Sequence, residues 1–211
     1  MYRMVYCFIN RSESIFCGWF KNRMLSIIIF FLTLISCNNT DEIPKPRGYF
    51  RIDFPEKKYF TYVSPECNFS FETPTYSLVV PDHSDSTELC WFNIEFPTQK
   101  GSIHFSYKNV NNNLSLFTED TRSLAYKHTV EADAINEEYI NYPAKKLYGI
   151  IYHIEGNAAS SLQFYLTDST KKFIRGSLYF NVIPNKDSIA PVADFINIDI
   201  AHFIETFKWS R

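Results

Sequence analysis

The stretch LYGIIYHIEGNAASSLQFYLTDSTKKFIRGSLYFNVI, residues 147–183, determines the fold class. In residues 147–154 the side chains of Tyr148, Ile150 and Tyr152 share one face, which is the period-two pattern of a β-strand. Residues 162–167 and 173–183 follow as further strands, separated by the polar turn at residues 168–172. Strands joined by such short connections pair antiparallel, so this stretch predicts three neighbouring antiparallel strands.

Similar alternation occurs along the first half of the chain. Residues 102–108 place Ile103, Phe105 and Tyr107 on one face, and residues 90–96 alternate in the same way. Shorter or weaker strands are expected at residues 50–54, 68–72, 76–80 and 135–141. Together these segments predict a domain that consists largely of half-buried strands.

Two segments repeat their apolar residues at helical spacing instead. Residues 114–130 predict a helix that begins after the N-cap Asn113. In a second helix near the C-terminus, Asp187 and Ser188 offer caps, and Pro191 falls in the first turn, where its missing N–H does no harm. The apolar residues of the second helix recur at three- and four-residue steps: Val192, Phe195, Ile196, Ile200, Phe203 and Phe207.

The predicted order of elements is five or so strands, a helix, four strands and a helix. Runs of strands with helices packed on them are typical of the α+β class. We therefore expect a mainly antiparallel β-sheet with two principal helices packed on it. This order is similar in outline to the Mog1/PsbP-like architecture.

The N-terminal segment carries an export signal. Lys21 and Arg23 precede the apolar run 24–35, which leads into the tetrapeptide Leu34-Ile35-Ser36-Cys37. A positive flank, a short apolar core and a small residue before the cleavage point form a secretory signal peptide. The tetrapeptide resembles a lipobox, whose cysteine receives several lipid chains that together anchor a protein firmly. Residues 1–36 are therefore expected to be a lipoprotein signal peptide, and Cys37 the lipid-modified residue.

A transmembrane helix that stays in place is the alternative for this apolar run. Spanning a bilayer takes about 20 apolar residues, whereas this run is shorter and is interrupted by Ser26 and Thr33. The segment before the run is long for a leader, so translation could begin at Met1, Met4 or Met24. We favour an upstream start, because a start at Met24 would remove the positive flank.

Cleavage would leave 175 residues, enough for one domain with a core. Residues 37–47 are polar and contain prolines, which predicts a lipidated tether. Residues 48–211 are expected to form a single α+β domain outside the cytoplasm. From Cys37 onward there are 17 Lys and Arg against 22 Asp and Glu, a net charge of −5. This balance argues against nucleic acid as a partner, because nucleic-acid binding needs a basic surface. The lysine pairs are typical of solvated turns: residues 57–58, 145–146 and 171–172.

Cys67 and Cys90 are the cysteines that remain beside Cys37 once the signal peptide is removed. The bacterial periplasm is oxidising, so this pair is a candidate disulfide. Such a bond would stabilise the fold by about 3 kcal/mol on chain-entropy grounds. Two buried thiols that never meet are the alternative, because the sequence does not reveal how far apart they lie.

The chain shows no motif of a known catalytic class. It contains no Gly-x-Ser-x-Gly elbow, no phosphate-binding glycine loop and no His-Glu-x-x-His helix. The loop at residues 82–85 could hold a cation weakly, but a hydrophilic connection explains it equally well. We expect no enzyme activity, no metal and no cofactor.

Aromatic residues make up 18% of the chain, and several need not face the core. These are Tyr49, Tyr59, Phe60, Tyr62, Trp91 and Tyr165. Two interpretations remain open for them. Exposed aromatic side chains would form a partner-binding surface, whereas a sheet covered on both faces would bury them.

Three tripeptides resemble the Asp-Ser/Thr-small-or-aliphatic pattern of periplasmic O-glycosylation in Bacteroidetes. They lie at residues 85–87, 168–170 and 187–189. The candidate acceptors are Ser86, Ser169 and Ser188. A glycan would require each of these side chains to face solvent.

Longer stretches resemble the gliding motility lipoprotein GldD family of Bacteroidetes. They are PKPRGYFRID at 44–53, CWFNI at 90–94, LAYKHTVEADAI at 124–135, GNAAS at 156–160, and QFYLTDST, RGSLYFN and PNKDS within 163–188. These stretches extend from the tether almost to the C-terminus. The resemblance implies an envelope lipoprotein that is needed for gliding on surfaces, is linked to type IX secretion and has no catalytic residues.

The expected function is therefore a non-enzymatic scaffold or assembly factor for gliding motility and the linked type IX protein secretion. Its partners would be the membrane, through the lipid on Cys37, and other envelope proteins of gliding and secretion. The lipid anchor could lie in the inner or the outer membrane. The alternative function is a periplasmic module that binds a small molecule or a metal. A hydrolase whose reactive groups meet only in space is the third option.

Overall fold

The computed structural model describes Arg23 and residues 51–64, 66–82 and 90–210. The predicted tether and the rest of the predicted signal peptide lie outside these residues. The described elements follow in the order β1 (Tyr59–Val63), β2 (Phe69–Pro74), β3 (Leu78–Pro81), β4 (Phe92–Phe96), β5 (Gly101–Asn109), α2 (Leu114–Tyr126), η1 (Lys127–Val130), β6 (Ala132–Tyr142), η2 (Pro143–Lys145), β7 (Leu147–Gly156), β8 (Ser160–Thr167), β9 (Lys172–Phe180), α3 (Lys186–Thr206) and β10 (Lys208–Trp209). The predicted order of strands and helices is confirmed, with β10 added at its end.

The strand pairs of the described residues are all antiparallel. Seven strands form one sheet in the order β3-β4-β5-β9-β8-β7-β6, and a smaller sheet has the order β1-β2-β10. The strands predicted from residues 147–183 are neighbours in the large sheet, where Ile151 lies opposite Phe164 and Phe164 opposite Gly176. The α+β prediction with a mainly antiparallel sheet is therefore confirmed.

Pairing of β5 with β9 joins the two halves of the domain. The pairs run from Gly101 opposite Phe180 to Asn109 opposite Lys172. After β5 the chain passes through α2, forms β6, β7 and β8, and returns with β9 beside β5. This pairing makes one continuous sheet from two separate runs of strands.

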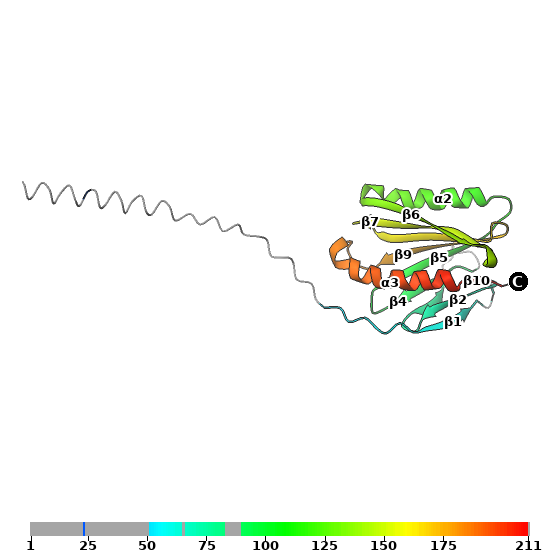
Figure 1. Cartoon of the computed structure of the whole chain (residues 1–211), viewed down its shortest axis with the longest axis horizontal. Coiled ribbons are helices and arrows are strands. Elements are labelled where there is room, and N and C mark those ends of the chain that lie inside the picture. The colour runs from blue at the N-terminus through cyan, green and yellow to red at the C-terminus, as the bar shows by residue number, and fades with distance from the viewer. Residues whose placement is uncertain (1–22, 24–50, 65, 83–89, 211) are drawn as a thin grey trace, which may run out of the picture. The chain divides into compact units, whose positions relative to one another are not determined.

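The two helices cover opposite faces of the large sheet, as Figure 1 shows. On one face the Phe203 ring of α3 has its centroid 5.1 Å from that of Phe105 and 5.9 Å from that of Phe164. On the other face Phe117 of α2 lies 5.5 Å from Phe173 between ring centroids. Because both faces are covered, aromatic side chains on both sides of the strands are core residues, which accounts for their abundance.

Residues 51–54 do not form the predicted strand. Phe54 instead stacks on Phe195 of α3, with 4.4 Å between ring centroids, and Ile52 is exposed. The first strand is β1, a few residues later, where it pairs with β2. Alternation indicates which side chains can be buried, but a strand also needs a neighbour that receives its backbone hydrogen bonds.

The start of α3 differs from the prediction. The N-cap is Asn185, whose Oδ1 accepts a hydrogen bond from the Ser188 N–H at 3.2 Å, so neither Asp187 nor Ser188 is the cap. Pro191 consequently lies inside the helix, beyond its first turn. Several polar residues precede this helix, and the one that caps it depends on where the connection from β9 turns, which the sequence does not show.

The helix predicted at residues 114–130 is present as α2 continued by η1. Asn113 occupies the N-cap position, but its Oδ1 accepts from the N–H of Asn111 at 2.8 Å and from no helix N–H. The asparagine therefore stabilises the turn before the helix, a local bond that competes with capping.

Candidate functional site

Some residues predicted to be modified or to bind a cation lie outside the described residues: Cys37, Ser86 and residues 83–85 of the candidate cation-binding loop. Ser169 and Ser188 are both exposed. Ser169 lies in the turn between β8 and β9, and Ser188 lies in the first turn of α3. Both hydroxyl groups are at positions that a glycan could reach.

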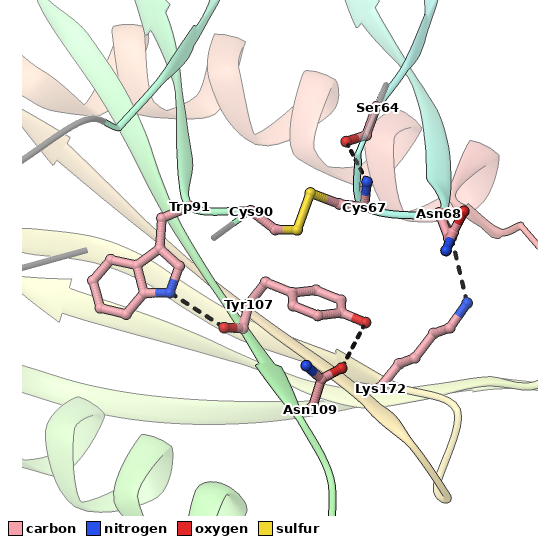
Figure 2. The surroundings of a disulfide bond; sticks show 8 residues. All are labelled: Ser64, Cys67, Asn68, Cys90, Trp91, Tyr107, Asn109 and Lys172. Atoms are coloured by element: carbon pink, nitrogen blue, oxygen red, sulfur yellow. Dashed lines mark hydrogen bonds between the residues drawn. A yellow bond between two sulfur atoms is a disulfide. The ribbon is translucent and has the colours of Figure 1, made fainter. Parts of the chain in front are cut away.

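Cys67 and Cys90 are joined by a disulfide, with their Cα atoms 5.7 Å apart (Figure 2). Cys67 precedes β2 of the small sheet and Cys90 precedes β4 of the large sheet, so the bond links the two sheets. Next to it, the Trp91 Nε1–H donates to the carbonyl of Tyr107 on β5 at 3.2 Å. The disulfide therefore lies next to a hydrogen bond that connects the residue before β4 to β5.

The turn between β8 and β9 is organised by Asp168. Its Oδ1 accepts hydrogen bonds from the backbone N–H groups of Thr170, Lys171 and Lys172, at 2.9, 2.7 and 2.9 Å. Burial alone would raise the pKa of the Asp168 carboxyl, but these N–H groups outweigh it and hold the pKa below its ordinary value. From the same turn, Lys172 Nζ donates to the carbonyl of Asn68 at 3.4 Å (Figure 2).

Asp199 on α3 has 3% of its surface exposed and is the centre of a polar network. Its Oδ1 accepts from the Tyr59 hydroxyl at 2.9 Å and lies 2.7 Å from Lys57 Nζ. Its Oδ2 accepts from the Tyr76 hydroxyl at 2.6 Å. Lys57 Nζ also donates to the carbonyl of Phe195 at 2.7 Å. We call Lys57, Tyr59, Tyr76 and Asp199 the clamp.

The clamp is a structural device. Burial lowers the pKa of Lys57, although contact with Asp199 acts in the opposite direction. Burial and the Asp199 carboxylate both raise the pKa of the Tyr59 and Tyr76 hydroxyls, so these groups stay protonated and remain donors. The clamp therefore holds β1, and the segment before it, on α3. It also corrects the prediction of a solvated turn at residues 57–58 for Lys57, whereas Lys58 is exposed as predicted.

For six aromatic residues the sequence left open whether they face a partner or the core, and most of them are packed. Tyr49 lies outside the described residues, and Phe60 is exposed, at 42%. The other four are buried or partly buried: Tyr59, Tyr62, Trp91 and Tyr165. These four side chains therefore pack within the domain, although only Tyr165 lies in the sheet that is covered on both faces.

A cavity of about 490 Å³ lies between the N-terminal half of α3 and the ends of β7 and β8. This volume is within the range of about 300–1,000 Å³ that is typical of small-molecule sites. β9 ends at Phe180, three residues before its predicted end, and the connection after it forms part of the wall. The apolar lining consists of Ile154, Ala158, Ala159, Phe180, Val182, Pro184, Ile189, Ala190 and Ala193.

Two β-bulges shape the strand ends near the cavity. The pairing of β8 with β9 is shifted at Ser161, which has no partner on β9 and lines the cavity. The pairing of β6 with β7 is shifted at Asp133, whose Oδ2 lies 2.8 Å from Nζ of the lining residue Lys186. A bulge redirects a side chain that regular pairing would place elsewhere.

Gly156 permits a close approach of backbones where β7 ends. Its φ is +118°, and a Cβ atom there would lie 2.7 Å from both the Asp133 nitrogen and the Glu131 oxygen. The Asn157 N–H donates to the same Glu131 carbonyl at 3.1 Å, and Asn157 Oδ1 accepts from the Lys186 N–H at 2.9 Å. The turn between β7 and β8 is thereby fixed to the starts of both β6 and α3, which holds the cavity walls in place.

Two buried polar atoms on residues that line the cavity, Ser161 Oγ and Asn197 Oδ1, have no hydrogen-bond partner. Most buried polar atoms in proteins are paired, so an unpaired one calls for a physical explanation. Unpartnered buried donors also occur at Gln163 Nε2 and Arg175 Nε, but these residues do not line the cavity. Both atoms are closed off from solvent even though other atoms of the two residues line the cavity.

The two basic side chains that line the cavity are paired with acids. Lys186 lies against Asp133, and this contact raises the pKa of Lys186. His153 Nε2 lies 3.0 Å from Glu138 Oε2 on β6. Neither side chain therefore offers an unpaired positive charge to an anion.

The sequence pattern does not identify Ser161 or Asn197 as site residues. The signal that was available is the run of small residues GNAASS at 156–161, between two strongly patterned strands. Small side chains at a strand end leave space, but the run does not show that α3 encloses that space.

Among the described residues, no group of three or more His, Cys, Asp or Glu side chains could hold a metal ion. The described helices also include none that is both long enough and apolar enough to cross a membrane.

Comparison with known proteins gives a family and a similar structure. The family model described as gliding motility lipoprotein GldD matches residues 39–209 of the chain. No curated protein matches it. Among solved structures, the chain is similar to the solution structure of cyanobacterial PsbP (CyanoP) from Synechocystis sp. PCC 6803. The TM-score is 0.46 and the sequence identity 10%, over 76% of this chain and 98% of that one.

Proposed function

The chain belongs to the gliding motility lipoprotein GldD family, and we propose that it is a non-enzymatic scaffold or assembly factor for gliding and the linked type IX secretion. The family consists of lipoproteins linked to gliding motility, which implies an envelope protein anchored to a membrane. The proposal rests on the extent of the family match. The match begins two residues after Cys37 and includes every described strand and helix.

The arrangement of the domain supports a role as a platform on a tether. The first described residues after the tether contact α3, through Phe54 stacked on Phe195 and through Lys57 in the clamp. A pull on the lipid anchor would therefore reach the core through α3. The disulfide links the two sheets and the clamp holds β1 on α3, so both would resist such a pull.

An edge of the large sheet offers a surface for a partner. β6 is the last strand in the sheet order, and Tyr139 on it is 74% exposed. Edge strands present backbone groups that can pair with another chain. An exposed tyrosine beside such groups adds binding energy at an interface.

The role of the lipid anchor is tested by complementing a null strain and measuring colony spreading and adhesin secretion. We expect the wild-type gene to restore both, and Cys37→Ala to restore neither, because the domain loses its position in the envelope. Cys17→Ala is the matched control, since that cysteine lies in the predicted leader and its loss leaves the anchor intact. A null strain that glides and secretes normally would rule out the proposal.

The partner role is tested by crosslinking in living cells, with a photoreactive amino acid in place of Tyr139. We expect reproducible crosslinks to envelope proteins of gliding or secretion, and their loss when Cys37→Ala is added. The same photoreactive residue at Ser169, exposed in the turn between β8 and β9, is the control position. Crosslinks that are identical at both positions would contradict a specific partner surface on β6.

Binding of a small molecule is a second function that one observation favours. The cavity beside α3 has a volume of about 490 Å³ and largely apolar walls, which is typical of a small-molecule site. The two functions are compatible, because the cavity and Tyr139 involve different side chains.

A further inference from the structure

We propose that the domain rests on the bilayer that holds its lipid anchor, through an apolar surface formed by the start of the domain and one side of α3. This surface, which we call the docking face, consists of Ile52, Phe54, Pro191, Phe195 and Ile198. The inference rests on the membrane anchor of the proposed function and goes beyond it, because an anchor alone leaves the orientation of the domain open.

The side chains of the docking face lie close together. The Phe54 ring stacks on Phe195, with 4.4 Å between centroids, and Ile52 is two residues before Phe54. Side chains three or four positions apart on a helix are neighbours, which places Pro191 and Ile198 on either side of Phe195 along α3. Phe195 is partly buried, and the other four residues are exposed. Single apolar side chains on a surface are ordinary, but a contiguous group of them marks a contact site.

The predicted tether identifies the bilayer as the occupant of the docking face. Thirteen residues, 38–50, separate Cys37 from Arg51, and they span at most about 50 Å when fully extended. The docking face includes residues that directly follow this tether, so the anchor limits its distance from the bilayer more closely than that of any other surface of the domain. A tethered contact forms at a high effective concentration, and a weak affinity is therefore sufficient.

The size of the docking face favours a bilayer over a free protein. A stable protein interface takes about 20–30 residues from each partner, and the docking face has far fewer. Contact with a bilayer needs no partner of complementary shape, because each apolar group that enters the interfacial region of the lipids gains free energy by itself.

The charges beside the docking face, outside the clamp, indicate which lipids suit it. Arg51 Nε lies 2.9 Å from Asp53 Oδ1, and Lys58 Nζ lies 2.7 Å from Glu56 Oε2. Asp194 adds an exposed carboxylate on α3. Anionic lipids attract clusters of basic side chains, and here the basic side chains do not outnumber the acidic ones. The contact should therefore depend on apolar burial and gain nothing from anionic lipid.

Quenching of a fluorophore by nitroxide-labelled lipids tests this orientation. Ile198 on α3 and Leu116 on α2 are 58% and 57% exposed, and the two helices cover opposite faces of the large sheet (Figure 1). Ile198→Cys and Leu116→Cys are each introduced into the full-length lipidated protein and labelled with the same fluorophore, because Cys67 and Cys90 are closed in the disulfide. In phosphatidylcholine vesicles we expect strong quenching at position 198 and little at position 116. Adding phosphatidylglycerol should leave both values unchanged.

A charged substitution tests whether the apolar side chains hold the contact. Ile52→Glu should lower the ratio of docked to undocked protein about tenfold and so remove most of the quenching at position 198. Val130→Glu is the matched control, because Val130 is an exposed apolar residue after α2 and lies outside the docking face. It should be quenched at position 198 as the unsubstituted protein is.

Flotation of the protein with the vesicles separates the anchor from the orientation. Protein that floats but is quenched equally at positions 198 and 116 would overturn the docking face and leave the anchor in place. Protein that does not float would overturn both. Quenching at position 198 that persists in Ile52→Glu, or that requires phosphatidylglycerol, would also overturn the proposal. No partner protein is present, so these results are independent of the gliding and crosslinking tests.

Discussion

Asn197 and Asp199 lie two residues apart on α3, yet their surroundings differ in kind. Asp199 is bound by three donors, from Lys57, Tyr59 and Tyr76. Asn197 lines the cavity, and its Oδ1 has no partner. Each residue of a helix is turned by about 100° from the one before it, so these two side chains leave α3 on nearly opposite sides. One side of the helix holds the fold together, and the other side forms the site that we propose for a ligand.

The contrast separates buried polar groups that have a hydrogen-bond partner from buried polar groups that have none. A buried group that is paired within the fold contributes to stability, and removing its partner is costly. A buried group without a partner makes the fold less stable than an apolar side chain would, so stability alone does not account for it. Substitutions at the two kinds of position should therefore change the free energy of unfolding in different ways.

The largest effect is expected at the clamp. Asp199→Ala leaves the Lys57 ammonium and two tyrosine hydroxyls without their acceptor, and should lower the free energy of unfolding by about 4 kcal/mol. Chemical denaturation measures this loss. Asp194→Ala is the control on the same helix, since Asp194 is exposed, and it should change stability by less than about 0.5 kcal/mol. Equal losses in the two variants would show that the clamp does not stabilise the fold.

The disulfide should have the next largest effect. Replacing both Cys67 and Cys90 with alanine opens the loop of 23 residues that the bond closes, at a loss of about 3 kcal/mol. Thermal unfolding with and without a reductant provides the measurement. A reductant should lower the melting temperature of the wild type and leave the double variant unchanged. If the reductant left the melting temperature of the wild type unchanged although it reduced the bond, the disulfide would not stabilise the fold.

The turn between β8 and β9 should show a smaller effect that depends on pH. The pKa of Asp168 is lowered in the folded state, so its contribution is complete above the unfolded value of about 4 and is lost as pH falls through the folded value. Asp168→Asn should cost about 1 kcal/mol at neutral pH. The difference between wild type and variant, measured by denaturation from pH 7 downward, should shrink below about pH 4. A difference that is constant with pH would exclude the charge as its cause.

Most of the fold could be predicted from the sequence because its strands are long and their side chains alternate. Residues 102–108 and 147–167 show this plainly, and both helices have an apolar stripe. β1 was missed because its sequence, YFTYV, contains four bulky side chains and one threonine without alternation. β10 was missed because a strand of two residues is too short to show the alternation of apolar and polar side chains.

The clamp and the cavity could not be predicted for a different reason. Tyr59 and Asp199 are 140 residues apart in sequence, and Lys57 belongs to a lysine pair that is typical of a surface turn. They come together because α3 packs on β2, the neighbour of β1, and because Tyr59 stacks on His202 of α3. The cavity depends on a bulge that redirects Ser161, and a bulge is a property of the pairing of two strands and not of either sequence alone.

The smallest effect on stability is expected at Asn197, and it is the sharpest test of the comparison. Asn197→Leu removes an acceptor that has no donor, so the free energy of unfolding should stay within about 0.5 kcal/mol of the wild type or rise. Asn185→Ala is the control, because Asn185 caps the same helix and its loss should cost about 1 kcal/mol. Urea denaturation of the two variants measures both values. If Asn197→Leu cost as much as Asn185→Ala, its carboxamide would be structural like the clamp. An unchanged stability would show that the oxygen, unlike the clamp, contributes nothing to the stability of the fold.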